Sequence, residues 1–194
     1  MKKLLIWIII LGALAVGGYM YTQNGGQGSG DVPQISGGSV PEGWIVSAGD
    51  GLAFSYPEAI SASYIGMIIW PPQGYLLGAG PISCVEAKTA IGQTSKRVIE
   101  GNTYCVTENT EGAAGTISTQ YAYAFEKGGQ VAALIFSLRY RQCANFPEPK
   151  KAECETERKT FSVDKLANTI AQSFKIGKLE DAPSTSSSTI PKGQ

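Results

Sequence analysis

Two strand-like runs, residues 116–126 and 130–140, flank Gly128-Gly129 and constrain the fold more than any other feature of the sequence. Because glycine adopts positive φ readily, this turn predicts a tight β-hairpin in which Lys127 faces Gln130. One face of the hairpin is then large and apolar, with the pairs Phe125/Ala132, Tyr123/Leu134, Tyr121/Phe136, Thr119/Leu138 and Ile117/Tyr140. The opposite face carries smaller side chains, with the pairs Ala124/Ala133, Ala122/Ile135, Gln120/Ser137 and Ser118/Arg139. We expect a helix to approach this second face closely.

The sequence predicts an amphipathic helix near the end of the chain. Ser162 is a typical N-cap residue, and Phe161 before it can pack on Leu166 as a hydrophobic staple. Gly177 is suited to end the helix. The apolar stripe of this helix consists of Val163, Leu166, Ala167, Ile170, Ala171 and Phe174.

Further strands are predicted upstream of the hairpin. The candidates are Leu52–Tyr56 ending at Pro57, Ile65–Trp70 closed by Pro71-Pro72, Pro81–Thr89, and Arg97–Glu108 with a bend at Gly101-Asn102. Together with the hairpin they give six or seven mostly antiparallel strands. The predicted fold class is α+β, with the C-terminal helix packed on one face of the sheet.

Two segments resemble the PsbP/Mog1-like α/β proteins. Residues 51–58 (GLAFSYPE) are similar to the opening strand of that family, and Leu166–Ile176 resembles its final helix and exit. The layout of the chain also resembles uncharacterised single-pass bacterial envelope proteins. The resemblance implies an antiparallel sheet with helices packed on it, and an accessory or partner-binding role without catalysis. The chain departs from the family in lacking a helical pattern after Pro57 and in carrying four cysteines.

The N-terminus consists of Lys2-Lys3 and an unbroken apolar run, Leu4–Tyr21. Such a run spans about 27 Å as a helix, close to the hydrocarbon thickness of a bilayer. Residues 1–21 are therefore predicted to form a single-pass anchor, with the N-terminus cytoplasmic and the remainder outside. The alternative is a cleaved signal, because Ala13-Leu14-Ala15 has the small-x-small form of a cleavage site. The protein would then be secreted or periplasmic.

The composition of the rest of the chain divides it into three parts. Residues 22–41 are rich in Gly, Ser, Gln and Pro, which predicts a flexible linker. Residues 178–194 are rich in Ser and are expected to be a disordered tail. Residues 42–177 are left as the folded extracytoplasmic domain.

All four cysteines lie in the predicted domain. An even number in an exported domain indicates two disulfides, for which three pairings exist. Cys143 and Cys154 bracket a polar loop whose two prolines oppose regular structure, so pairing them is the economical choice and leaves Cys84 to pair with Cys105. A zinc site is the alternative, but the chain has no C-x-x-C pair.

Composition excludes several classes of function. The chain has no histidine, which removes Ser-His and Cys-His nucleophile pairs and histidine-ligated metals. Its 16 Lys and Arg balance 16 Asp and Glu, so nothing indicates nucleic-acid binding. We expect no cofactor and no nucleic-acid partner.

Two carboxylates, Glu108 and Glu111, are the candidates for chemistry. They flank Asn109-Thr110 and could act as acid and base, or hold a hard cation with their neighbours. The competing interpretation is a solvated connection between strands.

Two further groups of residues are candidates for binding surfaces. A basic group could contact lipid phosphates or an anionic polymer, but glutamates interleave with it, which favours a solvated mixed-charge loop. Trp70 and Tyr75 flank a proline turn and would suit ligand stacking or a partner contact, against core packing of Trp70 as the default. The basic residues are Arg139, Arg141, Lys150, Lys151, Arg158 and Lys159.

Two functions of different classes remain. The first is a membrane-tethered extracytoplasmic binding or accessory module that engages another envelope protein or a surface polymer. The second is an envelope hydrolase or lyase that uses Glu108 and Glu111 with an arginine, which requires both carboxylates to line one concave pocket.

Overall fold

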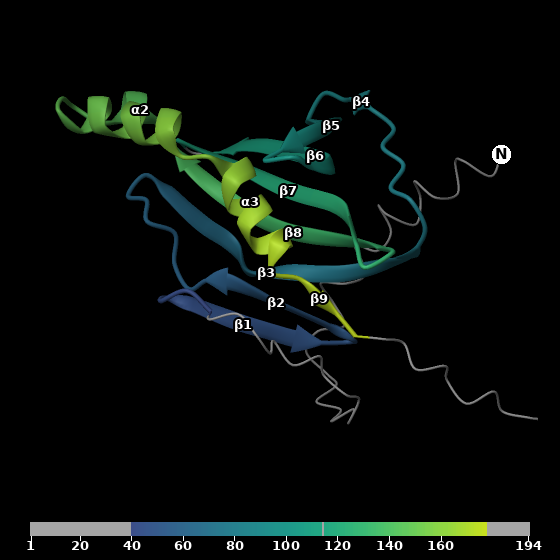
Figure 1. Cartoon of the computed structure of the whole chain (residues 1–194). Helices are drawn as coiled ribbons and strands as arrows, with labels where there is room; N and C mark the ends of the chain where they lie inside the picture. Colours follow the sequence, from purple (N-terminus) through teal and green to yellow (C-terminus); the bar gives the residue numbers. More distant parts are fainter. Residues whose placement is uncertain (1–39, 114, 178–194) are drawn as a thin grey trace, which may run out of the picture. The chain divides into compact units, whose positions relative to one another are not determined.

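The computed structural model describes residues 40–113 and 115–177. The predicted anchor, the predicted tail and all but the last two residues of the predicted linker lie outside the described residues. The described chain is α+β, as expected from the sequence, with strands in two antiparallel sheets and two α-helices (Figure 1).

The strands form a small sheet and a large sheet. The small sheet has the order β1–β2–β9, with β1 at Trp44–Gly49, β2 at Leu52–Pro57 and β9 at Lys175–Ile176. The large sheet has the order β3–β8–β7–β6–β5–β4, with β3 at Ile65–Ala79, β4 at Ala87–Lys88, β5 at Gly92–Ile99, β6 at Asn102–Ala113, β7 at Thr116–Lys127 and β8 at Gln130–Arg141. A 3-10 turn at Cys143–Asn145 (η1) precedes the helices α2 at Lys150–Thr160 and α3 at Val163–Gln172.

The predicted hairpin is confirmed as β7 and β8, in the predicted register. Lys127 pairs with Gln130, and every pair expected from the sequence follows outward from it. Both turn glycines have positive φ, 58° at Gly128 and 77° at Gly129. We call the face that carries the aromatic side chains of β7 and β8 the inner face of the large sheet, and the opposite one the outer face. The inner face is the core: Tyr123, Phe125, Leu134, Phe136 and Leu138 are buried there.

The predicted helix is confirmed as α3, but the face on which it packs was predicted wrongly. Ser162 is the N-cap, and its Oγ accepts a hydrogen bond from the Lys165 backbone at 3.1 Å. The buried side of α3, including Ala167 and Ile170, belongs to the same core cluster as the aromatic residues of the inner face. Figure 1 shows α3 crossing the strands of the large sheet. Covering large aromatic rings removes far more apolar area from water than covering alanines does.

The end of α3 also differs from the prediction. The helix ends at Gln172, and Gly177 lies beyond β9, where its backbone N–H donates to the Gly51 carbonyl. Ser173 is the C-cap, and its Oγ accepts a hydrogen bond from the Ser55 backbone of β2 at 2.8 Å. The chain leaves the helix early because this bond and the pairing of β9 with β2 carry it into the small sheet.

Three strand predictions need correction. The strand that begins at Ile65 continues through Pro71-Pro72 as β3, because an edge strand tolerates proline, and the strand absorbs it with register shifts. Only Ala87–Lys88 of the candidate at 81–89 is a strand. The candidate at 97–108 is a hairpin of β5 and β6 rather than one bent strand, with positive φ at Glu100 and Gly101 making the turn.

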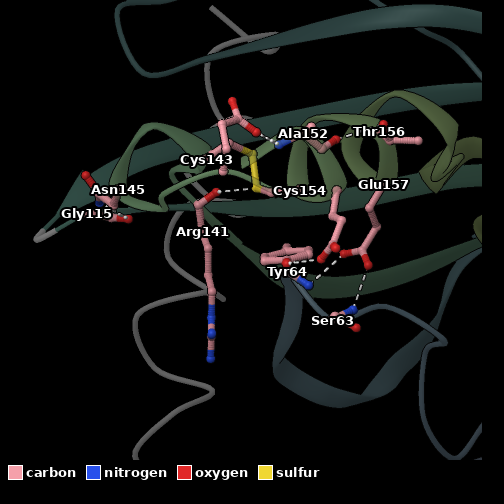
Figure 2. The surroundings of a disulfide bond; sticks show 12 residues. Ser63, Tyr64, Gly115, Arg141, Cys143, Asn145, Ala152, Cys154, Thr156 and Glu157 are labelled. Atoms are coloured by element: carbon pink, nitrogen blue, oxygen red, sulfur yellow. Dashed lines mark hydrogen bonds between the residues drawn. A yellow bond between two sulfur atoms is a disulfide. The ribbon is translucent and has the colours of Figure 1, made fainter. Parts of the chain in front are cut away.

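The polar loop between Cys143 and Cys154 contains a helix that the sequence analysis missed. The prolines of this loop predict irregular structure, yet Pro149 is the N-cap of α2, because proline is well tolerated at the start of a helix. Glu157 of α2 binds the segment before β3, accepting hydrogen bonds from the Ser63 and Tyr64 backbones, both at 2.7 Å (Figure 2).

The two sheets are in close contact at Gly74 of β3. A Cβ atom there would lie 2.6 Å from Phe54 Cε1 and 2.8 Å from Leu52 Cδ2, both side chains of β2. Phe54 and Leu52 are buried, so neither has room to turn away. Glycine at this position therefore allows the small sheet to pack on the large one.

We predict that Gly74→Ala destabilises the protein by about 1–3 kcal/mol, because the new methyl group overpacks the contact between the sheets. Urea unfolding at equilibrium measures the change. The matched control is Gly66→Ala on the same strand, where a Cβ atom would meet nothing within 4 Å. The packing argument is wrong if both variants have the same free energy of unfolding.

Candidate functional site

A group of charged side chains, which we call the Arg97 cluster, lies on the inner face beside the start of α3. Arg97 of β5 donates through Nη2 to Glu108 Oε2 of β6 at 2.9 Å, and through Nη1 to Asp164 Oδ1 of α3 at 3.0 Å. The side chains of Arg97 and Glu108 are 24% and 21% exposed, so water screens these ion pairs only in part. The cluster joins the first turn of the helix to two strands.

Neutral side chains complete the Arg97 cluster. Gln93 Nε2 donates to Glu108 Oε2 at 2.9 Å, and the Tyr123 hydroxyl donates to Asp164 Oδ1 at 2.7 Å. Burial lowers the pKa of Arg97, but hydrogen bonds and charges from Glu108 and Asp164 outweigh it, so that pKa lies above its ordinary value. Burial, reinforced by the hydrogen bond to Asp164, raises the pKa of Tyr123. The cluster therefore keeps a cationic Arg97 and a neutral Tyr123 at physiological pH.

The same inner face carries a second polar group around Asn168 of α3, which is buried. Its Oδ1 accepts hydrogen bonds from the Tyr104 hydroxyl at 2.6 Å and from Asn102 Nδ2 at 3.1 Å. Its Nδ2 donates to Glu100 Oε2 at 2.7 Å. Within the described residues, no buried side-chain nitrogen or oxygen lacks a partner. These groups fasten α3 to the β5–β6 hairpin.

The two carboxylates proposed from the sequence lie on opposite faces of the large sheet. Glu108 pairs with Tyr121 and shares the inner face with it, whereas Glu111 pairs with Ser118 of the outer face. Successive side chains of a strand alternate between faces, so two residues three apart cannot line one pocket from the same strand. The arginine that the hypothesis required accompanies Glu108 alone.

Sequence reasoning named Glu108 and an unspecified arginine, and it missed four members of the Arg97 cluster: Gln93, Arg97, Asp164 and Tyr123. They come from three different elements, and no local spacing connects them to Glu108. A usable signal was present for Gln93. Recognising a turn at Glu100-Gly101 and counting outward from it places Gln93 directly opposite Glu108.

Both disulfides follow the pairing preferred from the sequence. Cys84 bonds to Cys105 of β6, and Cys143 of η1 bonds to Cys154 of α2 (Figure 2). All four cysteines of the chain are used in these two bonds. Disulfides persist in oxidising compartments, and two of them indicate an oxidising, extracytoplasmic environment for the domain.

The two other groups of candidate residues are divided by the fold. Trp70 packs edge-on against the Phe136 ring, and its Nε1 donates to the Pro57 carbonyl at 3.1 Å, whereas Tyr75 is exposed. The two rings therefore do not form one stacking surface. Of the basic residues, Arg158 lies over the Tyr140 ring, 5.5 Å from its centre.

Two depressions of the described surface are open to solvent. One of about 420 Å³ lies between the β5–β6 turn and the end of α3, and carries both signs of charge through Lys96 and Glu126. Another, of about 550 Å³, follows the exposed side of α2. Among the described residues, no group of His, Cys, Asp and Glu has the arrangement of a metal site.

Large apolar side chains are exposed mainly along sheet edges. Of the nine in the described chain, five lie on β1 or β3, which are edge strands of the small and the large sheet. These five are Ile45, Val46, Ile68, Tyr75 and Leu77. Apolar side chains on an edge strand lie beside unpaired backbone groups, and such an edge is a surface on which another chain can pair.

We predict that Arg97→Met destabilises the protein by about 1–2 kcal/mol, because it leaves Glu108 and Asp164 without their cation. Chemical denaturation at neutral pH measures the loss. The control is Arg139→Met, which removes an exposed arginine from the outer face and should change the free energy of unfolding by less than about 0.5 kcal/mol. Equal effects of the two variants would contradict a stabilising role of the cluster.

We also predict that stability falls above pH 10, the ordinary pKa of tyrosine. The pKa of Tyr123 is raised in the folded state, so the unfolded chain loses this proton first, and stability that is complete below pH 10 is lost as the pH rises. Denaturant unfolding between pH 8 and pH 11 measures the slope, to which each such tyrosine adds up to about 1.4 kcal/mol per pH unit. Tyr123→Phe should reduce the slope by one such contribution, and an unchanged slope would refute the assignment.

Neither helix of the described chain is long and apolar enough to cross a bilayer. The predicted span at Leu4–Tyr21 is not among the described residues. The chain has no match among protein-family models, curated proteins or solved structures.

Proposed function

We propose that this protein is a membrane-tethered binding or accessory module of the cell envelope. In this proposal Leu4–Tyr21 holds the chain in the membrane, residues 22–41 give the domain reach, and the domain contacts another envelope protein or a surface polymer outside the cytoplasm. The two disulfides support the compartment. An accessory role without catalysis is also what the resemblance to the PsbP/Mog1-like proteins implies.

One observation carries the binding role: the exposed apolar side chains are concentrated on the edge strands β1 and β3. Edge strands also present backbone donors and acceptors, so an apolar edge offers both hydrophobic area and hydrogen bonds to a partner.

The alternative, a hydrolase or lyase using Glu108 and Glu111, has weaker support. Its two carboxylates lie on opposite faces of the sheet. Glu108 Oε2 already accepts hydrogen bonds from Arg97 and Gln93. An acid–base pair needs two groups that reach the same bound substrate, and side chains on opposite faces of a sheet do not provide this.

We predict that photo-crosslinking residues placed at Val46 and Leu77 capture a discrete partner in intact cells. A photo-crosslinker at Lys159, on the exposed side of α2, is the control and should give no discrete product. The crosslinked membrane fraction, digested without reduction, also reports whether the N-terminal apolar peptide is retained. Absence of any adduct from both edges, or recovery of the chain in the cytosol with free thiols, would refute the proposal.

A further inference from the structure

The outer edge of β1 is regular and open in the described part of the chain. β1 pairs with β2 over its whole length without a register shift, and no described strand pairs with its other edge. The Glu58 N–H donates to the Gly43 carbonyl, so backbone groups at 43, 45, 47 and 49 point toward β2. The N–H and C=O groups of Val46 and Ala48 therefore point outward.

The other sheet edges in the described residues are poor templates for an added strand. β3 has three register shifts and contains Pro71-Pro72, which have no N–H to donate. β4 and β9 are two residues long. Proteins commonly protect sheet edges by such bulges, prolines and short strands. β1 has none of these features, although it is six residues long.

The side chains of β1 suit an apolar partner. Ile45 and Val46 are 40% and 43% exposed, and as consecutive residues they project from opposite faces of the small sheet. β1 contains no charged residue. An added strand would therefore cover apolar surface on both of its sides while its backbone pairs with β1.

The charged residues at the two ends of β1 are negative, and the lysine of the small sheet, Lys175, lies two strands away from β1 on β9. Glu42 and Glu58 lie at its beginning, since Glu58 binds the Gly43 backbone, and Asp50 follows its last residue. All three are exposed, and the sequence has no lysine or arginine between residues 40 and 87. A segment that matches these charges has an uncharged centre about 20 Å long and basic residues at both ends.

We propose that β1 binds an extended segment of another protein by strand addition, and that this segment carries lysine or arginine on both sides of an uncharged centre. This inference rests on the proposed binding function and names its partner. A second copy of the chain fits less well, because antiparallel pairing of two β1 strands centred on Val46 places Glu42 of one copy opposite Asp50 of the other.

The test uses the full chain, purified from membranes with its disulfides intact, and synthetic peptides. One peptide alternates valine and threonine over the length of β1 and has two lysines at each end; a second has glutamates in place of the lysines. Fluorescence anisotropy at low salt should show binding of the lysine peptide at least about tenfold tighter than the glutamate peptide. Amide exchange of Val46 and Ala48 should slow when the lysine peptide binds.

Two pairs of variants separate the backbone and charge contributions. Val46→Pro removes an outward N–H and should weaken binding about tenfold, whereas Val46→Thr keeps the N–H and a branched side chain and should bind normally. Glu42→Gln with Asp50→Asn should weaken binding about three- to tenfold at low salt and have no effect at high salt. Asparagine suits position 50, where φ is +51°. Glu111→Gln with Glu155→Gln is the charge-matched control.

Three results would overturn the inference. The first is that the lysine and glutamate peptides bind with equal affinity, or that neither peptide binds. The second is protection of the Val46 and Ala48 amides in the free chain, which would mean that another segment of the chain occupies the edge. The third is a dimer that Val46→Pro dissociates. If one of these results is obtained but a crosslinker at Leu77 still captures a partner, the inference about β1 is wrong and the proposed function is retained.

Discussion

The whole architecture depends on the packing of one aromatic side chain, Phe174, between the two sheets. Its ring stacks on Phe54 of the small sheet, with centroids 4.7 Å apart, and meets Phe125 of the large sheet edge-on at 5.0 Å. Phe174 is fully buried and follows Ser173, the C-cap of α3. Its burial acts together with the Ser55–Ser173 bond and the pairing of β9 with β2 in ending the helix, and the Gly74 contact depends on the resulting position of the small sheet.

Local patterns in the sequence predicted the elements whose stability is local. The Gly128-Gly129 turn and the Ser162 cap each act within a few residues, and both were read correctly. The prediction of the sheet face on which α3 packs was wrong. The small residues of the outer face permit close approach of a helix, but the large rings of the inner face gain more from burial. The helix α2 was missed because Pro149 was read as a breaker, when a proline at that position costs the helix no hydrogen bond. Nothing local marked β9, which exists only through pairing with β2.

The candidate site was less predictable than the fold. Glu108 was singled out for its proximity to Glu111, yet its real partners are Arg97 and Gln93 across a hairpin that was read as a single strand. Asp164 and Tyr123 join them only after α3 docks on the inner face. Disulfide pairing was easier, because sequence separations of 11 and 21 make both loops short to close. Sites assembled from several elements have no linear spacing to detect.

The placement of the two disulfides has a mechanical consequence. The covalent rings enclose residues 84–105 and 143–154, and neither ring includes β1, β2 or β9. A pulling force applied at residue 40 therefore loads only backbone hydrogen bonds and packing contacts first, beginning with the pairing of β1 and β2. β1 can therefore separate from β2 without either disulfide being broken or its ring being extended.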